Sequence, residues 1–189
     1  MKGLKKLKRQ IEAYKPFNEQ ESRDKEFMLE FIEKFGEKSL YRSSVAAHFT
    51  ASAFIFNQEH TKVLMCEHNI DKSLAWLGGH ADGVADMLQV VSCEIYEESG
   101  ITKYHPITTD IASLTCVSIN GHEKNGKYVS SHVHMDVAYV FEADENEELR
   151  SCPDENTGGR WVTFEEMREQ VADTWREKRV YEKLLEKYL

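Results

Sequence analysis

Cysteine, proline and long apolar runs are all scarce in this chain, and each shortage excludes a class of protein. The four cysteines show no C-x-x-C spacing, so neither a zinc cage nor a disulfide framework is indicated, and reduced thiols in a cytoplasmic setting are expected. No apolar run approaches the ~18 residues that a membrane span needs, and the basic N-terminus lacks the apolar core of a secretion signal. Internal repeats and low-complexity linkers are absent, and only three prolines interrupt the chain.

Positive charge is also in short supply, because 24 Lys and Arg stand against 33 Asp and Glu, for a net charge of −9. That balance argues against nucleic acid or an anionic membrane as a partner. The excess of negative charge fits a site that recruits cations, although solubility of the protein surface is the simpler explanation for it. The length of 189 residues and the hydrophobic content of 41% suit a globular domain with an extension.

Residues 1–42 are expected to form a helical extension packed on a main domain of residues 43–189. Apolar residues recur at the helical period among lysines before Pro16, and a second helix is expected from Asn18 to Gly36. A basic amphipathic helix is also typical of membrane-surface or nucleic-acid binding. A helix docked on its own domain is the favoured interpretation.

The rest of the chain mixes strand and helix patterns. Period-two alternation of β-type residues predicts strands near 44–57, 63–67, 111–120 and 128–142, and helical periodicity predicts a last helix near 174–188. Strands with helices before, between and after them predict an α/β domain whose sheet is covered on both faces.

One stretch concentrates the candidate chemistry, residues 78–101, which begins with a glycine pair and ends in Glu-Ser-Gly-Ile. We expect a loop here that leads into a helix over 87–99. Asp86 supplies an N-cap with Gln89 as its capping-box partner, and Gly100 stands where a left-handed residue would end the helix.

The carboxylates of Glu94, Glu97 and Glu98 share one face in the last turns of this predicted helix. The helix dipole disfavours carboxylates there by about 0.3–1 kcal/mol each. No Lys or Arg stands three or four residues away. A helical wheel places Glu98 inside the apolar stripe and Glu94 at its edge. A solvated acidic helix end is the ordinary interpretation, but crowding beside an apolar face favours a hard divalent cation with oxygen ligands.

The spacing of these residues resembles the Nudix box, G-x5-E-x7-R-E-U-x-E-E-x-G-U, in which U is aliphatic. The sequence supplies the box residues Gly79, Glu94, Ile95, Glu97, Glu98, Gly100 and Ile101 at the required positions. Two positions differ, because Ala85 replaces the first Glu and Cys93 replaces the Arg. The run GGHADG also resembles a bacterial subgroup of that family, which often lacks the first Glu.

The resemblance implies an α/β/α sandwich with a mixed β-sheet. It also implies hydrolysis of a diphosphate bond in a nucleoside diphosphate linked to another group. By the same resemblance, Glu97 and Glu98 would be the main ligands of Mg²⁺, with Mn²⁺ as the alternative ion, and Glu94 would be a ligand or the base that acts on water. Such an ion would neutralise the diphosphate charge that an acidic protein otherwise repels. Gly79 would let the loop backbone approach the site, and His80 would contact phosphate or have an ordinary loop role.

The two departures from the box leave other functions open. Cys93 cannot form the bidentate ion pair with which the family's Arg orients the carboxylates, and Ala85 removes another carboxylate. A catalytically silent domain that binds a nucleotide as a sensor is therefore an alternative. A related isoprenoid diphosphate isomerase is a weaker one, because Cys116 lacks a reactive setting. The substrate and the oligomeric state are not readable from the sequence, and a homodimer is among the alternatives.

A second polar pattern lies on the last predicted strand. His132, His134 and Asp136 alternate onto one face, either as a pocket wall that contacts phosphate or sugar, or as a solvent-facing surface. Zinc binding is disfavoured because no fourth ligand is visible, and His48 is interpreted as a partly buried strand residue. Glu155 lies in a loop where the resembling family often carries an auxiliary acid, although a surface acid is the favoured interpretation.

Overall fold

Strand β1 (Ala47–Asn57) is the middle of the sheet and is buried along its whole length. The computed structural model describes residues 2–68, 73–124, 126–150 and 156–189. In it, β1 pairs antiparallel with β2 (Lys62–His68) and β4 (Leu77–His80), and parallel with β9 (His132–Ala143). The sheet is therefore mixed, as the family resemblance implied, and β1 pairs with β9 along its full length.

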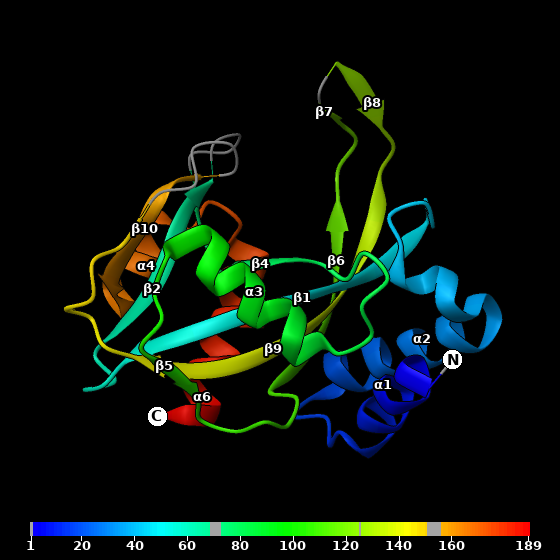
Figure 1. The fold of residues 1–189 in the computed structure, drawn as a ribbon, viewed down its shortest axis with the longest axis horizontal. Coiled ribbons are helices and arrows are strands. Elements are labelled where there is room, and N and C mark those ends of the chain that lie inside the picture. Colours follow the sequence, from blue (N-terminus) through cyan, green and yellow to red (C-terminus); the bar gives the residue numbers. More distant parts are fainter. Residues whose placement is uncertain (1, 69–72, 125, 151–155) are drawn as a thin grey trace.

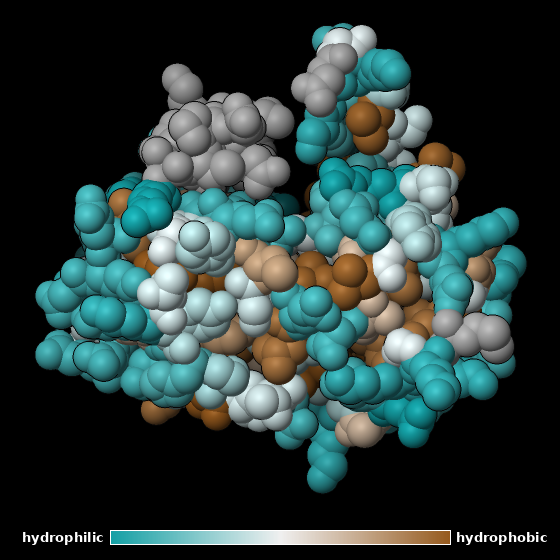
Figure 2. All heavy atoms as spheres, in the orientation of Figure 1, coloured by the Kyte–Doolittle hydropathy of each residue, from teal (hydrophilic) through white to brown (hydrophobic). Residues whose placement is uncertain are grey.

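The outer strands complete the sheet on both sides of this centre. The strand order is β10-β2-β1-β9-β5, with β10 (Asn156–Thr163) beside β2, β5 (Tyr104–Pro106) and β6 (Ser113–Ile119) beside β9, and β3 (Leu74–Ala75) beside β2. β7 (His122–Lys124) and β8 (Lys127–Val129) form a separate hairpin that projects from the body (Figure 1). Asn125, between these two strands in the sequence, lies outside the described residues. Figure 2 shows mostly hydrophilic residues on the face of this projection that is in view.

Helices cover both faces of the sheet (Figure 1). α3 (Met87–Ser99) lies on one face, and α4 (Phe164–Gln170) and a continuous helical segment lie on the other. That segment consists of α5 (Thr174–Arg176), a π-helical turn η2 (Glu177–Tyr181) and α6 (Glu182–Tyr188). The expected ends of α3 are confirmed, because the Asp86 side chain accepts from the Gln89 N–H at 3.4 Å and Gly100 has φ of 74°.

The period-two pattern of β1 divides its side chains between two cores. Phe49 and Ile55 pack in one cluster with Ile95 of α3, whereas Phe54 packs in the other with Leu184 of α6. Burial of large apolar side chains on both faces is the main stabilising term for such a sheet, at roughly 25 cal/mol per Å². The prediction of an α/β sandwich is confirmed.

The N-terminal helices belong to the first of these cores. α1 (Lys2–Ala13), α2 (Glu19–Phe35) and the short η1 (Gly36–Leu40) contribute buried apolar residues to the cluster that contains β1 and α3. The predicted start and end of α2 are confirmed, because the Asn18 side chain accepts from the Glu21 N–H and Gly36 has φ of 57°. No helix in the described part of the chain is long and apolar enough to cross a bilayer.

A buried ion pair joins α2 to α6. Lys183 Nζ lies 2.8 Å from Glu21 Oε1, and the two residues are 4% and 0% exposed. Glu21 also accepts hydrogen bonds from the Tyr14 hydroxyl, the Phe17 N–H and the Ser113 hydroxyl. Burial by itself raises the pKa of Glu21, but Lys183 and these donors outweigh it, so the pKa lies below its usual value and the carboxyl stays ionised.

We expect Lys183→Met to lower the free energy of unfolding by about 3–5 kcal/mol, because it leaves the Glu21 carboxylate buried without its cation. Chemical denaturation followed by circular dichroism measures this change. The control is Lys178→Met on the exposed side of the same helical segment, which should change stability by less than about 0.5 kcal/mol. A loss below about 1 kcal/mol for Lys183→Met would contradict the importance given to this pair.

Candidate functional site

The glycine pair of the box lies in strand β4, so the expectation of a loop at this position is wrong. Gly78 pairs with Ser52 and Gly79 with Ala51 of β1. A β-carbon on Gly78 would lie 2.5 Å from the Ala51 carbonyl oxygen, and one on Gly79 would lie 2.0 Å from Glu94 Oε1. Only residues without side chains allow this close approach of strand, sheet and helix.

Glu98 and Glu94 of α3 lie against these two glycines. Glu98 is 9% exposed, and its Oε2 accepts a hydrogen bond of 2.8 Å from the Gly78 N–H. Glu94 is half-buried, with its carboxylate in the space that a Gly79 side chain would fill. The wheel prediction that Glu98 lies within the buried face of the helix is confirmed. Two carboxylates one turn apart therefore contact neighbouring positions of one strand.

Glu97 is exposed, as is Cys93, which takes the place of the box arginine. Among the described residues, the triplet Glu94, Glu97 and Glu98 is not a group whose ligand atoms all lie within 4.8 Å of one another. The three carboxylates therefore do not form a compact cage. Mg²⁺ in proteins is usually held by one or two carboxylates together with water. The hard oxygens of Glu94 and Glu98 beside the glycine pair fit that demand.

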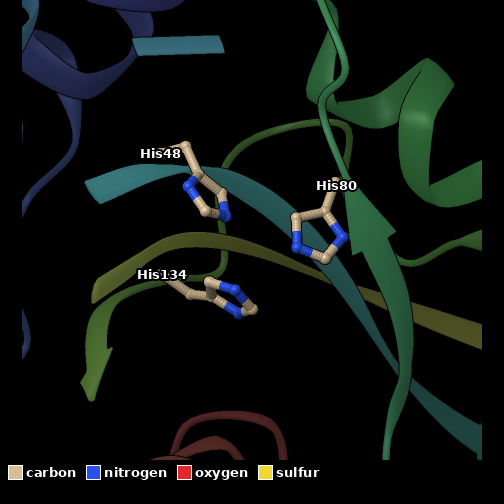
Figure 3. A group of neighbouring side chains, drawn as sticks. All are labelled: His48, His80 and His134. Carbon is tan, nitrogen blue, oxygen red and sulfur yellow. The ribbon is translucent and has the colours of Figure 1, made fainter. Parts of the chain in front are cut away.

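The opposite face of β4 carries different chemistry. His80 lies there beside His48 of β1 and His134 of β9 (Figure 3). In the sheet register, His48 is opposite His134 and His80 is opposite Thr50, so all three side chains leave the sheet on the same side. A ligand nitrogen from each ring lies within 4.8 Å of the others.

His132 extends this histidine cluster. Its Nε2 lies 3.1 Å from His134 Nε2, and its ring centroid is 5.0 Å from that of His48. Burial lowers the pKa of His80 to about 4 and that of His134 to about 2; Arg42 adds to the first shift and the neighbouring histidines add to the second. Burial also lowers the pKa of His48. These three rings are neutral near pH 7 and can offer lone pairs.

Asp136 lies on the same face of β9 and is 4% exposed. Its Oδ1 accepts hydrogen bonds from the hydroxyls of Thr50 at 2.7 Å and Ser52 at 2.8 Å. Its Oδ2 is buried and has no hydrogen-bond partner in the part of the chain that the structure describes. Burial raises the pKa of Asp136 to about 6. The alternative of a solvent-facing strand surface is therefore wrong for this residue.

Sequence reasoning placed His132, His134 and Asp136 on one face correctly, because alternation along a strand is a local property. The sequence pattern did not indicate that His48 and His80 lie beside these residues. His48 could be placed on a predicted strand, but His80 stood in an expected loop, and the pairing of β1 with β9 and β4 was needed to bring them together. Glu155, the weak candidate acid, lies outside the described residues.

A family model described as NUDIX domain matches residues 46–184. That match covers most of the chain, so the chain belongs to the Nudix family, as the box indicated. The N-terminal helices α1 and α2 precede the matched residues. The subgroup suggested by GGHADG stays a prediction. A search of curated protein sequences finds no match to this chain.

Solved structures share the fold at low sequence identity. The E. coli dihydroneopterin triphosphate pyrophosphohydrolase has a TM-score of 0.55 at 12% identity, covering 73% of this chain and 95% of that chain. The M. smegmatis Nudix hydrolase RenU has a TM-score of 0.54 at 14% identity, with coverage of 75% and 88%. A C. elegans Ap4A hydrolase binary complex has a TM-score of 0.50 at 14% identity, with coverage of 74% and 98%. At such identities the likeness concerns the fold alone.

We expect different effects on stability and on Mn²⁺ binding when each of the two glycines of β4 is replaced by alanine. Gly78→Ala should lower the free energy of unfolding by about 1–3 kcal/mol, because its β-carbon meets a backbone carbonyl that cannot move aside. Gly79→Ala should cost less stability, because the Glu94 side chain can rotate away, but it should weaken Mn²⁺ binding. Chemical denaturation and Mn²⁺ titration by electron paramagnetic resonance measure the two effects.

Gly159→Ala in β10 is the control, since its nearest neighbour for a β-carbon is Leu64 Cδ1 at an ordinary 3.4 Å. It should leave Mn²⁺ affinity unchanged. Wild-type Mn²⁺ affinity in Gly79→Ala would show that the position of the Glu94 carboxylate does not matter for the ion.

Proposed function

We propose that this protein is a Mg²⁺-dependent hydrolase that cleaves a diphosphate bond in a nucleoside diphosphate linked to another group. Mn²⁺ is the alternative ion. The observation that carries the proposal is the docking of Glu98 and Glu94 on the glycine pair of a Nudix chain, with the Gly78 N–H donating to Glu98. The partner is a small molecule, and the free thiols of Cys66, Cys93 and Cys116 agree with a cytoplasmic setting.

Glu94 and Glu98 are the residues that would hold the ion, and exposed Glu97 would contribute through water or by a change of side-chain rotamer. When bound, the ion would supply charge neutralisation of the diphosphate and a more acidic water molecule. The carboxylate of Glu94, half-buried beside Gly79, would act as a ligand or accept a proton from attacking water.

The missing arginine has a partial substitute in the backbone. Cys93 is exposed and cannot orient the carboxylates by a bidentate ion pair. The Gly78 N–H instead fixes one oxygen of Glu98, and a charge-assisted hydrogen bond of this kind is stronger than one between neutral groups. The carboxylate therefore has an orienting partner even though the box lacks its Arg.

The histidine face is less suited to the phosphate-contacting wall that the sequence suggested. The neutral, half-buried rings of His80 and His134 lack the positive charge that attracts phosphate. Binding of substrate by His132 and Asp136, and by the backbone at Gly79, stays a proposal. The predicted role of Glu155 stays a prediction as well.

A catalytically silent nucleotide sensor is the second candidate, and the exposed Cys93 in place of the Arg is the observation that favours it. The isomerase alternative is weaker still, because burial raises the pKa of the Cys116 thiol and so keeps it protonated. A hydrolysis screen with Mg²⁺ separates these functions. It should include ADP-ribose, NADH, dinucleoside polyphosphates, nucleotide sugars and oxidised nucleoside triphosphates.

Glu98→Gln and Glu97→Gln should each lower turnover of the best substrate by about 10² or more, because each removes a carboxylate charge without changing side-chain size. Glu98→Gln should stay folded, since the amide oxygen can still accept from the Gly78 N–H. Release of phosphate or nucleoside monophosphate, measured at saturating Mg²⁺, reports the turnover.

The matched control is Glu30→Gln on the exposed side of α2, which should leave turnover unchanged. Near wild-type hydrolysis by either Glu98→Gln or Glu97→Gln would remove that residue from the proposed site. Absence of Mg²⁺-dependent product release across the whole panel would favour the sensor instead.

A further inference from the structure

The histidine cluster collects its members from three strands that are far apart in the sequence. His48, His80 and His134 come from β1, β4 and β9, and their ring centroids lie 4.8–5.2 Å apart. Figure 3 shows the three rings turned toward a common space, with a nitrogen of each ring facing it. Such convergence is not required for packing, because an apolar side chain would fill each position at lower desolvation cost.

The hydrogen bond of His48 determines which of its nitrogens is available. His48 Nδ1 lies 3.2 Å from the Ser44 carbonyl oxygen, which can only accept, so Nδ1 carries the proton and Nε2 carries a lone pair. His48 is 4% exposed, and its Nε2 is buried without a hydrogen-bond partner among the described residues. A buried polar atom left unpaired costs free energy unless a ligand satisfies it.

Hydrogen bonds also fix the protonated nitrogens of His132 and His134. His132 Nδ1 lies 2.8 Å from the Ser130 carbonyl oxygen, so His132 Nε2 carries a lone pair. That atom lies 3.1 Å from His134 Nε2, which must then donate the hydrogen. The Nδ1 atom of His134 is left with a lone pair. Histidines that bind metals almost always donate their other ring N–H to a neighbouring acceptor, as His48 does to the Ser44 carbonyl oxygen.

The type of ligand atom decides which metal ions would suit the space between the three histidine rings. Neutral imidazole nitrogens suit zinc and other first-row transition metals, whereas Mg²⁺ prefers oxygen. Zn–N bonds of ~2.0–2.1 Å in a tetrahedron require ligand nitrogens ~3.3 Å apart. One nitrogen from each of the three rings lies within 4.8 Å of the other two, so a modest rotation of the side chains would close the site.

We propose that His48, His80 and His134 form a binding site for a divalent transition-metal ion of the zinc class. His48 Nε2 and His134 Nδ1 are two of the ligand atoms, and His80 supplies the third. His132 is a positioning residue that holds the ring of His134. Three histidines leave a fourth coordination position for water or an oxygen of a small molecule, as in catalytic zinc sites.

This site is separate from the carboxylates of α3. A β-carbon on Gly79 would point at Glu94, whereas one on Gly78 would lie 2.7 Å from Ser52 Oγ on the other side of the strand. His80 has the same strand parity as Gly78, so it faces away from α3. The inference therefore does not depend on the proposed hydrolase activity.

For the test, a chelator first removes any metal from the full chain, and dialysis then removes the chelator. Zn²⁺ affinity and stoichiometry are then measured by competition with a chromophoric chelator, and Co²⁺ is added in parallel for its visible absorption. We expect one tight Zn²⁺ per chain and a tetrahedral Co²⁺ spectrum. His80→Gln and His134→Gln should each weaken Zn²⁺ binding by more than ~100-fold, and His132→Gln by roughly 10–100-fold.

Two controls locate the ion. His105→Gln changes an exposed strand histidine outside the cluster and should leave Zn²⁺ affinity unchanged. Glu98→Gln should also leave it unchanged, because the carboxylate lies on the other face of β4. Loss of Zn²⁺ binding in Glu98→Gln with full binding in His80→Gln would overturn the proposal, as would the absence of stoichiometric Zn²⁺ binding to the wild-type chain.

A measurement on the wild-type chain covers the case in which a variant fails to fold. Nitrogen-15 spectra of the histidine rings, recorded with and without one equivalent of Zn²⁺, identify the ring nitrogens that coordinate. Coordination shifts at His48 Nε2, His134 Nδ1 and one nitrogen of His80 are expected. Zn²⁺-induced shifts confined to histidines outside these three would overturn the assignment.

Discussion

The contact between helix α3 and strand β4 is the constraint on which the candidate active site depends. Two successive residues without side chains let the Glu98 carboxylate reach the Gly78 N–H at 2.8 Å and let Glu94 fill the space beside Gly79. A carboxylate at the C-terminal end of a helix opposes the helix dipole, so it needs a donor or a cation to remain there. The backbone of β4 supplies the donor, and a hard divalent ion would supply the cation.

Strand β4 also separates two kinds of candidate metal-ligand atom, carboxylate oxygens and imidazole nitrogens. Its alternation directs Gly79 toward the carboxylates of α3 and His80 toward the rings of His48 and His134. Oxygen donors select ions such as Mg²⁺, whereas imidazole donors select zinc and related ions. One short strand therefore lies between two proposed sites whose ligand atoms favour different ions. The full-length parallel pairing of β1 with β9 keeps the second set of donors in register.

Much of the fold could be predicted because its signals are local. Helix ends were readable at Asp86 and Gly100, where a side-chain acceptor and a left-handed glycine act within a few residues. Strand alternation predicted which face His134 shares with Asp136. The glycine pair was misassigned as a loop, because glycine has low strand propensity and β4 exists only through its pairing with β1. The exposure of Glu97 and the spread of the three carboxylates Glu94, Glu97 and Glu98 could not be read from the helical period alone.

The sequence by itself determined the family, the spacing of the box and the burial of Glu98, because these follow from residue order and helical period. Only the tertiary structure decided that the Gly78 N–H donates a hydrogen bond to the Glu98 carboxylate. It also decided that His48 and His80 meet His134. Both outcomes depend on strand register between segments distant in the chain, and register is set by the packing of both faces of the sheet at once. No local pattern in the sequence carries that information.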